Sequence, residues 1–166
     1  MLVGVVAAVV VAFLVLTAVL FVFPATNAPQ RVDAVVVLGG SGDRLGKALT
    51  LVREGYAPVL LVSDHQEAPC LPDTRRYRVV CFNPDPATTQ GEAEEVGRIA
   101  SAHHWDRLLV VSSIPQTTRA RIRIDRCFHG TVLFDPVSPG GIAQWFFSLA
   151  YEWGALIKAF TLQRSC

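Results

Sequence analysis

The chain opens with an apolar stretch that predicts a membrane-spanning helix. Residues 2–23 are almost all Val, Ala, Leu and Phe, interrupted only by Gly4 and Thr17, and they include no charged side chain. About 20 helical residues cover the ~30 Å hydrocarbon core of a bilayer. A helix that is apolar on every side is not needed at the end of a small soluble domain. We therefore predict a transmembrane anchor at residues 1–23.

A cleaved signal peptide is the alternative interpretation of this stretch. Thr26, Asn27 and Ala28 loosely resemble a cleavage site, but the apolar run exceeds the ~7–15 residues of a usual signal core, and no Lys or Arg precedes it. These two features favour a retained anchor. Arg31, which follows the span, weakly favours a cytoplasmic body.

After a proline-containing linker at 24–31, apolar runs alternate with helical periodicity through residues 32–166, which we interpret as one domain. Continuous β-branched apolar runs predict buried strands at 32–38, 59–62, 77–82, 107–112 and 131–134. Helices are expected at 44–53, 88–103, 116–128 and 141–160. Such alternation predicts an α/β fold with a mainly parallel sheet of about five strands, covered on both faces. Because Glu152 and Lys158 interrupt the last helix, we expect it to be a core helix rather than a second span.

In parallel sheets of this kind, ligands bind beyond the carboxyl ends of the strands, where the strand order reverses. A glycine-rich turn follows the first strand and leads to Arg44, which could clamp a phosphate or carboxylate. The start of the next helix favours an anion as well. The residues of this candidate anion site are Gly39, Gly40, Ser41, Gly42 and Arg44. A tight turn that simply needs glycine, with a solvated arginine, is the structural alternative.

The other strand ends also carry polar residues. Ser63 and Asp64 follow the second strand. Thr88 or Thr89 can cap the helix after the third strand, and Glu92 has the capping-box spacing from Thr89. The end of the fourth strand carries hydroxyl, amide and guanidinium groups suited to an oxyanion, namely Ser112, Ser113, Gln116 and Arg119. We nominate three acids for proton transfer: Glu92, Asp64 and Glu152.

The turn after the first strand does not match two better-defined glycine motifs. Asp43 stands where Gly-x-Ser-x-Gly needs its second glycine, and Leu45 stands where Gly-x-Gly-x-x-Gly needs its third. Asp64 does lie roughly where a ribose-binding acid would, so a nucleotide-cofactor protein remains an alternative.

The net charge and the cysteine content limit the classes of partner and the compartment that we expect. With a formal net charge of +1, the chain has no overall field that would attract nucleic acid. The four histidines show no ligand spacing, and we expect neither a metal nor a cofactor. Behind an export-like segment, four cysteines permit two disulfides, and we favour Cys70 with Cys81 and Cys127 with Cys166. The cysteines favour a single-pass plasma-membrane protein whose body lies outside the cytoplasm.

Several of these segments together resemble the YdcF/SanA/ElyC-like family over roughly residues 32–160. The resemblance depends on the order and spacing of residues 33–40, Arg44, Thr89, Gly91, Glu92, Ala93, Ser112, Ser113, Arg119, Ala120, Tyr151 and Glu152. It implies a Rossmann-like three-layer fold, commonly behind a membrane anchor, and a role in envelope biogenesis and barrier function. The family usually has an aromatic residue and a histidine where this chain has Pro115 and Gln116.

These observations lead to two main functional hypotheses. In the first, the protein acts on or binds a phosphate-bearing envelope intermediate, such as a polyprenyl-linked one, held by Arg44 and Arg119. In the second, it is a non-catalytic envelope binding or scaffolding protein, because the amide of Gln116 does not titrate near neutrality. Both give it the bilayer and an anionic or lipid-linked ligand as partners.

Overall fold

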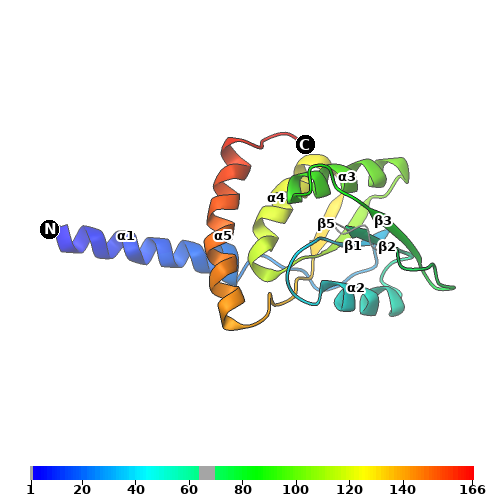
Figure 1. Ribbon diagram of the computed structural model, residues 1–166, viewed down its shortest axis with the longest axis horizontal. Helices are drawn as coiled ribbons and strands as arrows, with labels where there is room; N and C mark the ends of the chain where they lie inside the picture. The colour runs from blue at the N-terminus through cyan, green and yellow to red at the C-terminus, as the bar shows by residue number, and fades with distance from the viewer. Residues whose placement is uncertain (1, 64–69) are drawn as a thin grey trace.

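The computed structural model describes residues 2–63 and 70–166 and has the expected α/β architecture (Figure 1). Five strands form one sheet: β1 (Ala34–Val37), β2 (Val59–Ser63), β3 (Arg78–Phe82), β4 (Arg107–Val111) and β5 (Thr131–Phe134). The helices of the body are α2 (Arg44–Arg53), α3 (Thr89–Ala102), the short 3-10 turn η2 (Ile114–Gln116), α4 (Thr117–Cys127) and α5 (Ile142–Thr161). The predicted elements are all present, with ends that differ by a few residues.

All strands are parallel, in the order β3-β2-β1-β4-β5. The order reverses beside β1, which pairs with β2 on one side and with β4 on the other. The four apolar residues of β1 point alternately to the two faces of the sheet. Ala34 and Val36 join the core under α3 and α4, whereas Val35 and Val37 join the core under α2. Burial on both faces explains why the strand is a continuous apolar run.

The N-terminal apolar segment is a helix that projects from the body (Figure 1). α1 (Leu2–Thr17) continues into the π-helical turn η1 (Ala18–Val22). Together they form a 21-residue helix with a mean hydropathy of 3.2, which could cross a membrane or act as a signal sequence. The linker that follows is docked rather than free, because the Asn27 amide donates to the Phe134 carbonyl at 2.8 Å. The Asn27 side-chain oxygen accepts from the Phe134 amide at 3.1 Å.

α5 packs on the body through a narrow face. Its buried residues are Ser148, Glu152, Leu156 and Ala159, which are spaced by three or four residues and so lie on one side. The opposite side is exposed and apolar. The expectation of a core helix is therefore correct for one face only.

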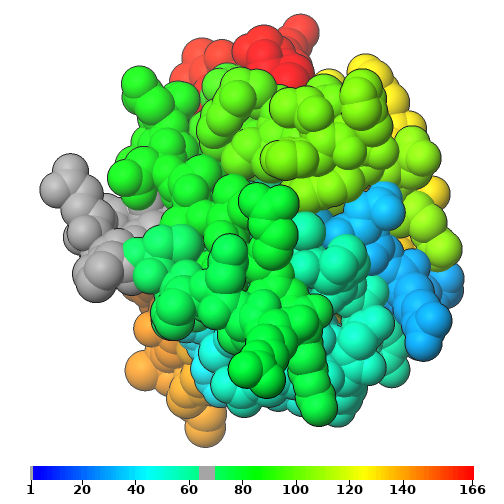
Figure 2. Space-filling view, turned by 90° about the vertical axis from the view of Figure 1, so that its right-hand side faces the viewer, coloured from blue at the N-terminus to red at the C-terminus, as the bar shows by residue number. Residues whose placement is uncertain are grey.

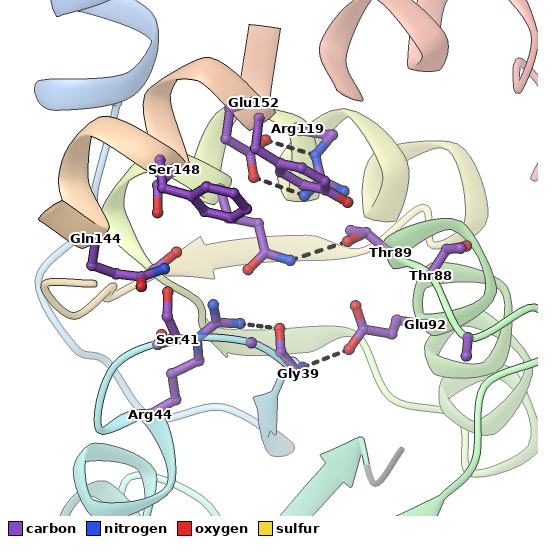
Figure 3. A pocket seen from close by; sticks show the side chains of 16 residues that line it. Gly39, Ser41, Arg44, Thr88, Thr89, Glu92, Arg119, Gln144, Ser148 and Glu152 are labelled. Carbon is purple, nitrogen blue, oxygen red and sulfur yellow. Dashed lines mark hydrogen bonds and ion pairs between the residues drawn. The ribbon is translucent and has the colours of Figure 1, made fainter. Parts of the chain in front are cut away.

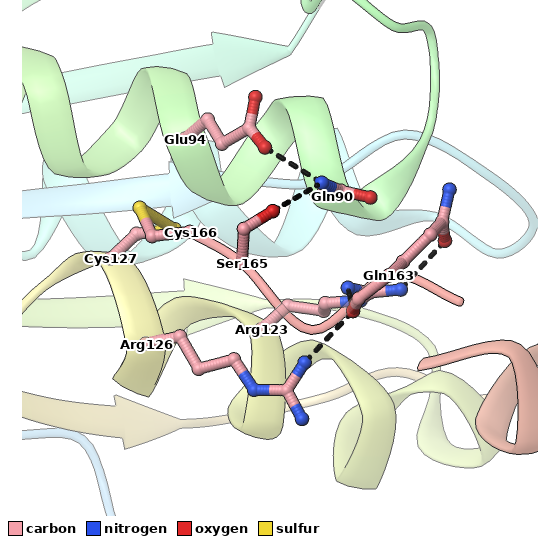
Figure 4. Close-up of a disulfide and its surroundings, with 8 residues drawn as sticks. All are labelled: Gln90, Glu94, Arg123, Arg126, Cys127, Gln163, Ser165 and Cys166. Atoms are coloured by element: carbon pink, nitrogen blue, oxygen red, sulfur yellow. Dashed lines mark hydrogen bonds between the residues drawn. A yellow bond between two sulfur atoms is a disulfide. The ribbon is translucent and has the colours of Figure 1, made fainter. Parts of the chain in front are cut away.

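Both predicted disulfides are present, Cys70–Cys81 and Cys127–Cys166. The second ties the C-terminus to the end of α4 (Figure 4). Arginines of α4 hold the same tail: Arg123 Nη2 donates to the Gln163 side-chain oxygen at 2.7 Å, and Arg126 Nη1 donates to the Gln163 carbonyl at 3.0 Å. These contacts fix how α5 lies against α4.

Candidate functional site

A pocket of about 340 Å³ opens at the carboxyl edge of the sheet, beside the strands where the order reverses (Figure 3). Ten of the residues nominated from the sequence line it: Gly39, Gly40, Ser41, Arg44, Thr89, Glu92, Ser113, Gln116, Arg119 and Glu152. They come from the loop after β1 and the start of α2, from the segment after β4 with η2 and the start of α4, from the start of α3 and from one side of α5. This is the location that the doubly wound topology predicts for a ligand site.

Arg44 forms one wall of the pocket. It is the first residue of α2, and its guanidinium turns back onto the loop that precedes the helix. Nε donates to the Ser41 carbonyl at 2.8 Å, while Nη1 donates to the Leu38 carbonyl at 2.9 Å and to the Gly39 carbonyl. Burial lowers the pKa of Arg44 to about 10, despite the opposing charge of Glu92.

Gly40 is needed for this arrangement of Arg44. Its φ of 126° lies in the region that favours glycine. A Cβ atom at this position would stand 2.5 Å from Nη2 of Arg44, so a side chain there would displace the guanidinium. The glycine-rich turn therefore positions an arginine, which is a more specific role than a permissive turn.

The helix start behind this turn is already capped. The Asp43 side chain accepts a hydrogen bond from the Gly46 amide at 3.0 Å, at the N-terminus of α2. One of the free amide groups at this helix terminus is therefore satisfied by a carboxylate of the chain itself.

Glu92 links α3 to the loop after β1. Its Oε1 accepts a hydrogen bond from the Gly39 amide at 2.6 Å, and its side chain is buried in the pocket wall. Thr88, one of the two predicted caps, is the N-cap of α3, and it accepts from the Gly91 amide. The capping-box pairing of Thr89 with Glu92 is wrong, because the cap is Thr88 and Glu92 lies four residues after it.

A buried ion pair closes the opposite wall (Figure 3). Arg119 Nε and Nη2 donate to the two carboxylate oxygens of Glu152 at 2.7 and 2.8 Å. Burial alone would lower the pKa of Arg119, but the hydrogen bonds and charge of Glu152 outweigh it and raise the pKa. The structure thus brings Arg44 and Arg119 into one pocket, together with Glu92 and Glu152. The formal charges in the pocket balance, and of the two arginines predicted to hold the ligand, Arg119 is already paired with Glu152.

Gln116 occupies the position where the resembling family usually has histidine. Its Nε2 donates to the Thr89 hydroxyl at 3.0 Å, and its side chain is 5% exposed. Its Oε1 has no hydrogen-bond partner within the described part of the chain. A buried amide oxygen without a donor is costly. The pocket therefore contains one acceptor that a ligand hydroxyl, amide or water would satisfy.

Four nominated residues do not contribute to the pocket lining that the structure describes. Gly42 packs against the backbone of Ser138, and Ser112 is fully buried with its hydroxyl 3.0 Å from that of Thr117. Ser63, the last residue of β2, is buried and lies outside the lining. Asp64 lies outside the described residues.

Six further residues line the pocket that were not predicted as site residues: Ala87, Thr88, Gln144, Phe147, Ser148 and Tyr151. Four of them belong to α5. A signal for them existed, because Gln144, Ser148 and Glu152 recur every four residues in an otherwise apolar helix and must share one face. Helical spacing alone did not show that this face would cover the end of β4.

Fold and site together define a doubly wound α/β protein with a charge-balanced polar pocket at the strand-order reversal, attached to an apolar helix. The family models, the curated proteins and the solved structures contain no significant match to this chain.

Proposed function

We propose that this chain is a membrane-tethered protein that binds the phosphate group of a lipid-linked intermediate of cell-envelope assembly. Arg44 carries the proposal. It is a buried cation in the pocket wall, its hydrogen bonds go to carbonyl groups, and no carboxylate of the described residues pairs with it directly. A phosphate oxygen is the partner that such a guanidinium lacks.

The rest of the pocket suits a ligand that is more than a bare phosphate. The free Oε1 of Gln116 accepts from a donor, as do the Thr88 and Ser148 hydroxyl oxygens that line the same space. A phosphate that carries a hydroxyl-rich group, such as a sugar, would supply both chemistries. Because the carboxylates balance the arginines, the pocket would discriminate by shape and hydrogen bonding rather than by charge alone.

The cellular setting is proposed from three observations. The 21-residue apolar helix supports a membrane tether, and two disulfides support an oxidising compartment outside the cytoplasm. The resemblance to the YdcF/SanA/ElyC-like family supports an envelope role. A lipid-linked phosphate is the class of ligand that meets a tethered protein in that setting.

Ligand titration with the full-length protein in detergent tests this proposal. We expect farnesyl phosphate to bind and farnesol to bind far more weakly. Arg44→Gln should weaken phosphate binding by about 1.5–3 kcal/mol, roughly tenfold to a hundredfold, because a charged hydrogen-bond donor is lost. Arg53→Gln, at the exposed end of the same helix, is the matched control. Equal affinities for wild type and Arg44→Gln would refute the phosphate assignment, and tighter binding of a nucleotide would favour the nucleotide alternative.

A second candidate function is turnover of the bound phosphate, with Glu92 as the proton-transferring group. It is favoured by the position of the Glu92 carboxylate in the pocket wall, where it accepts from the Gly39 amide of the loop whose carbonyl groups bind Arg44. Release of phosphate by the wild type, and its loss in Glu92→Gln with binding retained, would support catalysis. Release that appears only in Gln116→His would identify the natural chain as a binder.

A further inference from the structure

The outer face of α5 is an apolar surface exposed to solvent. Phe146 and Ile157 lie near the middle of the width of this face, and Ile142 and Phe160 lie at its border, one at each end of the helix. Phe146 is 70% exposed and Ile157 is 59% exposed. Lys158 is the only charged residue on the exposed part of α5. A face of this kind requires a partner, because isolated soluble domains rarely expose contiguous apolar patches of this composition.

The other surfaces of the body expose few large apolar side chains. Among the described residues, Leu45 and Leu71 are the only exposed large hydrophobic side chains outside residues 2–23 and 142–162. Figure 2 shows the face of the body turned away from α1, which consists mainly of α2, α3 and the chain leading to β3, with the red and orange segments of α5 and its flanks at the rim. Exposed apolar residues are therefore gathered on the side of the molecule that carries the N-terminal helix.

α5 is joined directly to that helix. Trp153 stacks on Phe13 with ring centroids 5.1 Å apart and meets Phe21 edge-on at 5.2 Å. Its indole nitrogen donates to the Thr17 hydroxyl at 3.1 Å. In Figure 1, α5 runs across the foot of α1 rather than alongside it. A membrane crossed by α1 would therefore lie roughly parallel to α5.

The exposed apolar surface of the N-terminal helix extends down to α5. A helix needs about 20 residues to cross the ~30 Å hydrocarbon core, and α1 with η1 has 21. The body already contacts this segment from Phe13 onward, and Phe21 is fully buried. Val15, Leu16 and Val19, in the stretch that α5 contacts, are 47–57% exposed and apolar. The exposed apolar surface of the span therefore continues to the level of α5, and a bilayer that covers this surface also reaches α5.

We propose that α5 lies in the membrane–water interface with its outer apolar face in the bilayer, so that the pocket opens at headgroup level. Phe147 and Tyr151, which are 67% and 57% exposed, line both the pocket and the edge of this face. A lipid-linked phosphate would enter between them, its chain remaining in the bilayer while its headgroup reaches Arg44. An interfacial helix buries its apolar side by about 5–10 Å in this way. This inference rests on the proposed function and names the route by which its ligand arrives.

Site-specific photo-crosslinking in the full-length protein tests the inference. The protein, with p-benzoylphenylalanine at Phe146 or at Ile157, is reconstituted in vesicles of phosphatidylethanolamine and phosphatidylglycerol and irradiated. Leu45 and Leu71, exposed leucines elsewhere on the body, are the matched control positions. We expect a mass increase of one phospholipid at both α5 positions and none above the unirradiated background at the controls. A non-reducing peptide map that shows the Cys127–Cys166 disulfide verifies that each labelled protein is folded. If the protein labelled at Phe146 or Ile157 fails this check, the label is placed at Phe160 instead.

Equal lipid labelling at all four positions would overturn the proposal, and so would an adduct with a second copy of the chain at the α5 positions. Absence of lipid adducts at α5 would also overturn it. The phosphate titration in detergent does not depend on a bilayer, so it separates the two ideas. Phosphate binding without lipid adducts would refute the interfacial placement and leave the proposed function standing.

Discussion

The ion pair between Arg119 and Glu152 yields the most demanding test of the structure. Both side chains are buried, and two hydrogen bonds of 2.7 and 2.8 Å join them. Replacing Glu152 with glutamine keeps the shape but leaves the Arg119 charge without compensation. Removal of one partner of a buried pair typically costs about 3–5 kcal/mol. For a domain whose total stability is about 5–15 kcal/mol, Glu152→Gln should therefore lower the free energy of unfolding severely.

Urea unfolding of the full-length protein in detergent, followed by tryptophan fluorescence, measures this loss. Trp153, next to Glu152 in the sequence, reports on the region. The double variant Arg119→Met with Glu152→Leu should recover much of the loss, because neither charge remains buried. Glu95→Gln is the control, since Glu95 forms a similar two-bond contact with Arg98 at the surface and should matter little. Near-zero coupling in a double-mutant cycle of Arg119→Met, Glu152→Leu and their combination would refute the reasoning. A Glu152→Gln protein as stable as the Glu95→Gln control would refute it as well.

Three further predictions concern the disulfide, the glycines and pH. Replacing Cys127 and Cys166 with serine should cost about 4 kcal/mol on the loop-entropy model, because the closed loop spans 39 residues; urea midpoints with and without reductant check this, and equal midpoints would contradict it. Gly97→Ala should destabilise by about 1–3 kcal/mol, because its Cβ would lie 2.4 Å from the Cys127 carbonyl oxygen. Gly154 is exposed in a helix, and no atom lies within 4 Å of a Cβ added there, so Gly154→Ala should stabilise the fold by about 1 kcal/mol. A higher melting temperature for Gly97→Ala than for Gly154→Ala would disprove the packing argument. Because burial lowers the pKa of Arg44 to about 10, phosphate affinity should fall as pH rises through that value. A phosphate affinity that does not change between pH 8 and 11 would contradict the assignment. The unfolded chain keeps the Arg44 proton to higher pH than the native state, so the contribution of Arg44 to the free energy of unfolding increases with pH above about 10.

Arg44 and Glu92 occupy the predicted edge of the sheet but have partners that the sequence did not predict. Their location was predictable, because the carboxyl ends of parallel strands share one edge and both residues follow such strands closely. Their partners were not. Glu92 has the spacing of a local capping box, yet it accepts from Gly39, which is 53 residues away in the chain. Local and long-range hydrogen bonds compete for the same carboxylate, and only the packing of α3 against the loop after β1 decides between them.

The amino-acid sequence by itself determined the apolar N-terminal helix, the order of strands and helices along the chain, the parallel sheet and the edge that carries the pocket. Each of these depends on periodicity, length or topology, which are properties of neighbouring residues or of the chain order. Only the tertiary structure decided that α5 covers the pocket, that Glu152 neutralises Arg119 and that the outer face of α5 remains apolar and exposed beside α1. These features depend on how one helix is rotated and placed against distant elements, and that placement comes from many weak contacts spread over the whole chain.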